Sequence, residues 1–108
     1  MKKIIIFGFI LFFQSLHSQQ STLNWYTDLN KAVNISLSEN KPLMLFFTGS
    51  DWCGWCIRLK KEVFNYPEFE TWTKNNVVLV ELDFPRRKTI DPRILKQNRE
   101  LARIFGVS

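Results

Sequence analysis

Two cysteines separated by two residues are the part of this sequence best suited to chemistry. Cys53 and Cys56 are the only cysteines of the chain, and they lie in the segment TGSDWCGWCIRLKKEVF at residues 48–64. A pair with this spacing can be a redox couple, half of a metal site, a haem-attachment point or a structural disulfide. The residues around the pair decide among these four.

The rest of the sequence argues against metal and haem. A tetrahedral zinc site needs four ligands, whereas the chain has two cysteines and one histidine, His17, near its N-terminus. Covalent haem requires a histidine directly after the second cysteine, and Ile57 is there instead. We therefore expect no metal and no bound cofactor. A structural disulfide remains the main alternative to a redox couple, although so small a loop would stabilise the fold little.

The flanking residues predict that the pair lies where a strand is followed by a helix. PLMLFFT (42–48) has the length and apolar character of a buried strand, and a helix is expected over about 53–64. Cys53 would then lie at a helix N-terminus, which favours a thiolate and can lower a cysteine pKa from about 8.5 to about 3.5–7.5. Cys56, one turn later, would face inward. This asymmetry suits thiol–disulfide exchange, in which Cys53 attacks and Cys56 resolves the mixed disulfide.

The remaining pattern completes an α/β unit. Apolar residues at helical spacing, together with helix stop and start signals, predict three further helices over 27–39, 67–76 and 92–105. A second apolar run predicts a strand over 77–83. Asp91 is the expected N-cap of the last helix, with Pro92 at its first position. The order helix, strand, helix, helix, strand, helix predicts parallel strands in a sheet covered on both faces.

The first eighteen residues have the pattern of a secretory signal peptide. A charged start is followed by an apolar run over residues 4–13 and by a polar exit that ends at Ser18. The apolar run is shorter than the roughly 20 residues of a membrane span, and a retained N-terminal anchor is the alternative. We expect a signal peptide over 1–18, a mature domain over 19–108, no membrane association after cleavage, and a periplasmic or extracellular location where disulfides persist.

The charge and the histidine content of the chain argue against two classes of function. Removing Lys2 and Lys3 with the signal lowers the 15 Lys and Arg residues to 13 against 10 Asp and Glu, so the net charge falls from +5 to +3. The mature chain would also lack histidine, which excludes Ser-His and Cys-His nucleophilic catalysis by its own side chains. The basic run PRRK (85–88) has no interleaved aromatic residues, so we interpret it as an exposed loop and expect no nucleic-acid binding.

The motif WCGWC, after an apolar strand and before an amphipathic helix, resembles the active-site segment of the thioredoxin-like superfamily. Residues 25–107 are similar to exported bacterial thioredoxin-like proteins through FTGSDWCGWC, the following EVF and PEF, and VELDFP. The resemblance implies a thioredoxin-like α/β fold that exchanges disulfides with protein thiols and is recycled by a redox partner. It implies that Cys53 is the nucleophile, Cys56 the resolving cysteine and Trp52 a wall of the substrate surface.

Two features depart from the thioredoxin pattern near the motif. Gly54 and Trp55 separate the cysteines in place of Gly-Pro; both are candidates for the substrate surface, although Trp55 could equally pack on its own helix. The position of the buried acid of thioredoxin falls on Phe46, and that of a nearby lysine falls on Glu81. One hypothesis is that Glu81 accepts the proton of Cys56; the other is that Glu81 is solvated at a strand end.

The sequence stops before the cis-proline loop, the two antiparallel strands and the last helix that follow in thioredoxin-like proteins. We therefore expect an incomplete fold that contains only the N-terminal helix, strand, helix, strand and helix portion, with the strand at 42–48 on an exposed sheet edge. Two alternatives to an oxidoreductase follow. One is a non-catalytic binding module that uses the surface of Trp52 and Trp55, and the other is a truncated remnant.

Overall fold

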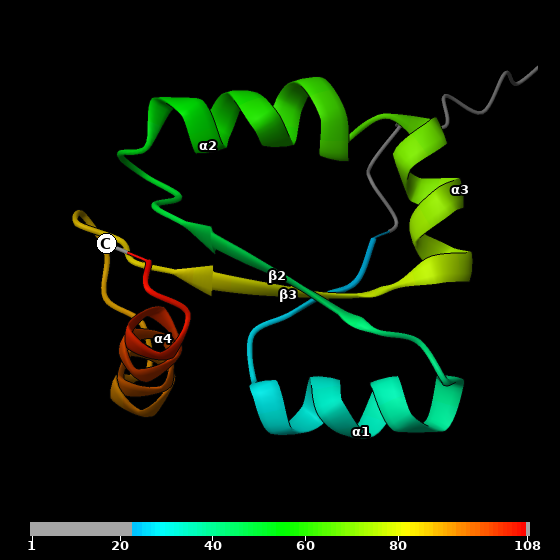
Figure 1. Ribbon diagram of the computed structural model, residues 1–108. Coiled ribbons are helices and arrows are strands. Elements are labelled where there is room, and N and C mark those ends of the chain that lie inside the picture. Colours follow the sequence, from blue (N-terminus) through cyan, green and yellow to red (C-terminus); the bar gives the residue numbers. More distant parts are fainter. Residues whose placement is uncertain (1–22, 108) are drawn as a thin grey trace, which may run out of the picture.

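Three parallel strands form the sheet of this protein. The computed structural model describes residues 23–107, and the predicted signal peptide lies outside them. The strands β1 (Trp25–Tyr26), β2 (Leu43–Thr48) and β3 (Val78–Asp83) are arranged in the order β1-β3-β2 (Figure 1). The two predicted strands and their parallel pairing are confirmed, with β2 at one edge of the described sheet. The two-residue strand β1 was not predicted, because so short a segment carries no period.

Three of the four described helices begin and end within two residues of the predicted positions, and the helix at the cysteines begins within one residue. The four are α1 (Leu29–Glu39), α2 (Gly54–Leu59), α3 (Pro67–Asn76) and α4 (Pro92–Ile104). Asp28 and Asp91 cap α1 and α4 by accepting hydrogen bonds from the backbone N–H groups of Asn30 and Arg93. Asn40 ends α1 in the left-handed conformation, with φ of 53°. The predicted helix over 53–64 differs only in its last turn, because α2 continues into a π-helical turn, η1 (Lys60–Phe64).

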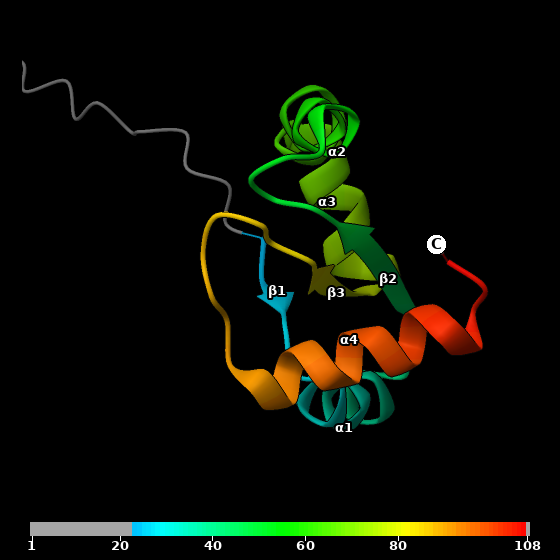
Figure 2. The ribbon, with the colours of Figure 1, turned by 90° about the vertical axis from the view of Figure 1, so that its left-hand side faces the viewer.

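Helices cover both faces of the sheet. In Figures 1 and 2, α2 and α3 lie on one side of the strands and α1 and α4 on the other. The apolar core on the α1 and α4 side contains four buried residues, Ala32, Val78, Val80 and Leu82, and Leu45, Phe47 and Leu101 are among the side chains that pack against them. The nearly continuous apolar pattern of both predicted strands has this cause, since neither face is left to water.

Aromatic side chains fill the space between the sheet and α2 with α3. Phe64, which is only 4% exposed, lies between Phe46 of β2 and Phe69 of α3, with ring-centroid distances of 5.0 and 4.8 Å. Trp25 of β1 packs 5.2 Å from the same ring. This cluster fixes the helix that begins at the cysteines, because Phe64 lies at the end of the continuous helical segment formed by α2 and η1.

No helix between residues 23 and 107 is both long enough and apolar enough to cross a bilayer.

Candidate active site

Cys53 and Cys56 are joined by a disulfide at the N-terminus of α2. Cys53 is the N-cap residue of the helix, in an extended conformation, and its Sγ accepts a hydrogen bond from the backbone N–H of Cys56 at 3.2 Å. The Cα atoms of the two cysteines are 5.2 Å apart, and both residues are half-buried. The predicted position of the pair at the junction of a strand and a helix is confirmed. A backbone donor aimed at a sulfur there favours a thiolate once the bond is reduced.

The loop between β2 and α2 is tied to the end of β3. The backbone N–H of Ser50 donates to the Asp83 carboxylate at 2.8 Å, and the Ser50 hydroxyl donates to the other oxygen of the same group. Asp83 is the last residue of β3. Because β2 and β3 are parallel, their carboxyl ends meet at one edge of the sheet, which is also where Cys53 lies. Asp83 therefore positions the loop that carries the cysteine pair.

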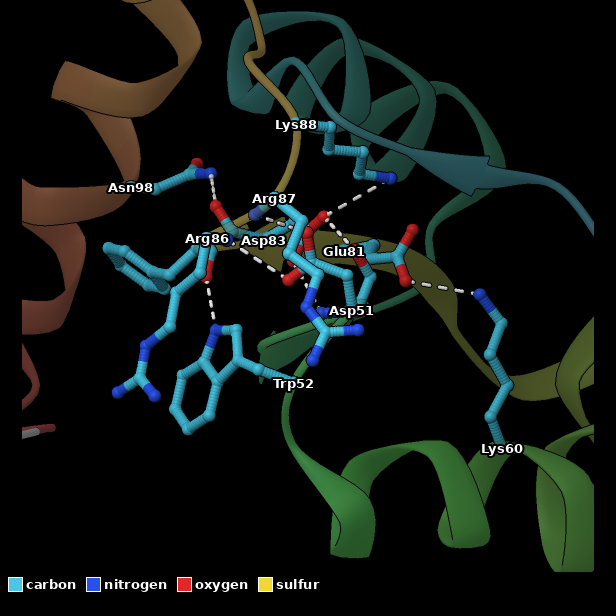
Figure 3. A network of polar contacts seen from close by, with 11 residues as sticks. Asp51, Trp52, Lys60, Glu81, Asp83, Arg86, Arg87, Lys88 and Asn98 are labelled. Atoms are coloured by element: carbon cyan, nitrogen blue, oxygen red, sulfur yellow. Dashed lines mark hydrogen bonds and ion pairs between the residues drawn. The ribbon is translucent and has the colours of Figure 1, made fainter.

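Asp51 holds the loop that follows β3 against the motif. Its carboxylate accepts hydrogen bonds from the backbone N–H groups of Arg86 and Arg87, at 3.0 and 2.7 Å (Figure 3). The bond from Arg86 is the largest of the effects that keep the pKa of Asp51 below its usual value of 3.8. The carboxylate is therefore ionised at neutral pH, and two segments separated by some 35 residues are joined beside the cysteines.

Trp52 is held on three sides. Its indole N–H donates to the carbonyl oxygen of Phe84 at 2.6 Å, and the guanidinium of Arg86 lies 3.8 Å from the ring centroid. Gly49 lies directly against the ring, so that a Cβ added to Gly49 would be 2.2 Å from Trp52 Cε2. The indole is still 42% exposed. Trp52 is thus a fixed, partly exposed aromatic surface next to Cys53.

An apolar pocket of about 320 Å³ lies between this wall and the end of the sheet. Both cysteines line it, together with Phe47, Trp52 and Phe84, and its far side is formed by Ala102 of α4 and by Val107. The pocket gives an apolar segment of another molecule direct access to the disulfide.

A second pocket, of about 260 Å³, lies on the other side of Cys56. Its polar lining includes Thr48, Lys60 and Glu81, and Glu81 Oε1 is 3.1 Å from Lys60 Nζ. The Glu81 side chain is 18% exposed and lies in the middle of β3, so it is not the solvated strand-end residue of the second hypothesis. Its partner across the strands is Phe46, as the match to thioredoxin implies. Glu81 carries the only carboxylate among the residues that line this pocket with Cys56.

The two residues between the cysteines face solvent. Trp55 is 79% exposed, and the guanidinium of Arg58 lies 5.7 Å from its ring centroid. Both readings of this residue therefore have some support, because Trp55 contacts its own helix and still presents most of its surface. A Cβ added to Gly54 would meet no atom within 4 Å.

Several residues of the site were missed by sequence reasoning. Asp51, Lys60, Asp83 and Arg86 all contact the motif loop, the indole or the pocket beside Cys56. The PRRK run carried a signal, but it was interpreted only as an exposed loop. Within residues 23–107 no group of three or more His, Cys, Asp or Glu side chains is placed to hold a metal ion.

Comparison with known proteins gives the family. A family model described as thioredoxin-like matches residues 24–105. The chain belongs to the thioredoxin-like family. The predicted thioredoxin-like α/β fold is thereby confirmed, and the disulfide at the start of α2 coincides with the redox motif on which the resemblance rested.

This thioredoxin-like chain is similar to two curated proteins of Chlamydia pneumoniae. It is 35% identical over 78 residues to the disulfide bond reductase DsbH, a match that covers 72% of the chain and 47% of DsbH. It is 32% identical over 84 residues to the thioredoxin-related protein DsbJ, which covers 78% of the chain and 24% of DsbJ. The chain therefore spans about half or less of the length of these relatives.

A solved structure of a DsbH oxidoreductase has the same architecture. Its TM-score with the chain is 0.73 at 34% sequence identity, over 80% of the chain and 59% of the DsbH structure.

Proposed function

We propose that this protein is an exported thiol–disulfide oxidoreductase that acts on protein thiols and disulfides through Cys53 and Cys56. The observation that carries the proposal is the disulfide between these two cysteines at the N-terminus of α2, in a family with relatives named as a disulfide bond reductase and a thioredoxin-related protein. A disulfide that closes so small a loop adds little to stability, which leaves redox exchange as its use.

The reaction is a two-step exchange. The Cys53 thiolate attacks one sulfur of a substrate disulfide, that S–S bond breaks, and the departing substrate thiolate takes up a proton. Cys56 then loses its proton and attacks Cys53 Sγ, which forms the Cys53–Cys56 disulfide and releases the second substrate thiol. The substrate gains two electrons, the protein loses two, and a dithiol partner returns them. With an oxidising partner the same steps run in reverse.

Three further assignments belong to this proposal. Trp52, Gly54 and Trp55 form the surface on which the substrate polypeptide lies, because they surround the cysteines and remain accessible. The N-terminal signal pattern supports removal of residues 1–18 and export, and an oxidising compartment is where such chemistry on protein disulfides takes place. The partners are therefore exported proteins with thiols or disulfides and one redox-recycling protein.

The test is the reduction of insulin by dithiothreitol, followed as precipitation of the released B chain, with and without catalytic amounts of the natural full-length protein. We expect clear acceleration. A binding module is the second candidate, because Trp55 is 79% exposed. Binding of unfolded insulin chains with no acceleration of their reduction would favour the module and contradict the oxidoreductase.

Glu81 is our candidate for the group that accepts the Cys56 proton. Its carboxylate lines the same pocket as Cys56, and Lys60 at 3.1 Å holds it in place. Glu81 lies opposite Phe46, the residue that stands at the position of the buried acid of thioredoxin and cannot itself accept a proton. A pocket of about 260 Å³ whose lining includes several polar side chains has room for water between the two groups. A carboxylate close to the thiol would speed its deprotonation in the second step.

Glu81→Gln is therefore expected to slow the resolving step by about 10²-fold, the lower end of the usual contribution of general acid–base catalysis. The attack by Cys53 should change far less. Stopped-flow measurement of mixed-disulfide decay from pH 5 to pH 9 tests this, with Glu62→Gln on the exposed side of η1 as the matched control. An unchanged pH profile of the resolving step in Glu81→Gln would show that Glu81 has only a structural role.

A further inference from the structure

The loop after β3 brings a pair of arginines to the edge of the cysteine site. Asp51 fixes this loop through the backbone N–H groups of Arg86 and Arg87, and the Trp52 indole bonds to the carbonyl of Phe84 just before them. Figure 3 shows the Arg86 and Arg87 side chains extending from the loop on the side where Trp52 lies. The backbone of both arginines and the guanidinium of Arg86 are therefore positioned by contacts with the motif.

The charges of these two arginines are not used inside the described part of the chain. Neither guanidinium has a carboxylate within ion-pair distance between residues 23 and 107, and both residues are exposed. The other basic residue of the loop, Lys88, faces Asp83 at 3.7 Å. Asp51 is engaged by backbone N–H groups rather than by a side-chain cation. Two positive charges thus remain available for another molecule.

The two tryptophans of the site differ in this respect. Arg58 lies over Trp55 but is paired with Glu62 at 2.9 Å, so the charge on that side is balanced. The guanidinium of Arg86 lies over Trp52, at 3.8 Å from the ring centroid, without an acidic partner between residues 23 and 107. Stacking on an indole leaves the edge of the guanidinium free, and that edge binds a carboxylate through two parallel hydrogen bonds. Unpaired positive charge therefore lies on the Trp52 side of Cys53, whereas the charge on the Trp55 side is balanced.

We propose that Arg86 and Arg87 form a recognition surface for carboxylate groups in the substrate polypeptide next to its reactive disulfide. A polypeptide whose disulfide reaches Cys53 must lay its neighbouring residues over Trp52, because the indole and both cysteines line the same pocket. An Asp or Glu side chain there would reach the guanidinium of Arg86. The inference rests on the proposed function and adds the substrate class, namely segments with acidic residues beside a cysteine.

The test uses three synthetic peptides, each closed by one internal disulfide that is flanked by Glu, Gln or Lys residues. The rate constant for oxidation of the reduced natural full-length protein is measured by tryptophan fluorescence and divided by the rate of each peptide with dithiothreitol. We expect the Glu peptide to react about tenfold faster than the Lys peptide, at the low end of electrostatic steering. In about 1 M salt, where the screening length falls to about 3 Å, the ratio should approach one.

Variants separate charge from shape. The double variant Arg86→Gln with Arg87→Gln should lose the preference, Arg86→Lys with Arg87→Lys should keep most of it, and Arg86→Glu with Arg87→Glu should invert it. Lys31→Gln on α1, across the sheet from α2 in Figure 1, is the control that should retain the ratio. Equal normalised rates for the three peptides, or an unchanged ratio in the double Gln variant, would overturn the recognition surface alone. No reaction with any peptide would overturn the oxidoreductase as well.

Discussion

Cys56→Ser is expected to turn the protein into a trap that stays covalently attached to its substrates. Cys53 can still attack a substrate disulfide, but no second sulfur is present to displace the product, so the mixed disulfide accumulates. Turnover should fall to the rate of the uncatalysed exchange. Non-reducing electrophoresis and intact mass after mixing with insulin measure the adduct, which should disappear on addition of dithiothreitol.

Cys53→Ser is the matched variant, with the same change three residues earlier. It should lose turnover to the same extent and form no adduct, because the sulfur proposed to attack the substrate is gone. Adducts of equal yield from both variants would mean that the cysteines are interchangeable, and the assignment of roles to Cys53 and Cys56 would then be wrong.

Gly49→Ala is expected to destabilise the protein by about 1–3 kcal/mol, the usual cost of forcing a methyl group into a packed site. The new Cβ would lie 2.2 Å from Trp52 Cε2. The indole cannot move aside freely, because it bonds to Phe84 and is covered by Arg86. The free energy of unfolding in urea gives the cost, and the fluorescence of reduced and oxidised protein reports the displacement of the indole.

A double-mutant cycle identifies the cause. In a Trp52→Ala background the methyl group of Gly49→Ala has space, so most of the cost should disappear. Gly54→Ala is the control, since its Cβ meets nothing within 4 Å, and it should be neutral or stabilising by about 0.4–1 kcal/mol. If Gly49→Ala cost as much without Trp52 as with it, the clash with the indole would not be the reason.

The elements that local chemistry specifies were predictable from the sequence. Asp28 and Asp91 cap the N-termini of α1 and α4, and Asn40 ends α1 in the left-handed conformation. Such signals depend on neighbouring residues only. The π-helical turn at the end of α2 was not predicted, because no residue pattern distinguishes it from a continuing α-helix. Strand β1 escaped prediction for a related reason, since two residues become a strand only when β3 is beside them.

The residues of the site also fall into two groups, those that could be predicted from the sequence and those that could not. The cysteine pair was predicted from its spacing, because the spacing itself carries the chemistry. Trp52 was assigned from the resemblance of WCGWC to the thioredoxin-like superfamily. The partners of the motif were not predicted, because Asp83, Phe84 and Arg86 are more than thirty residues away in the sequence. Only the register of β2 against β3 brings them to the motif. The PRRK run was recognised as basic, but its position beside the indole depended on that register.

The contacts that build the site differ greatly in how far they reach along the chain. The bonds of Ser50, Asp51 and Trp52 to the end of β3 and the loop after it join residues 32 to 36 positions apart, whereas the disulfide joins residues only three apart. Closing the short loop between the cysteines costs less entropy than closing the long loops of the other bonds, and it requires none of those bonds. Thiol labelling that finds this pair oxidised is therefore no measure of how much of the protein has folded around it.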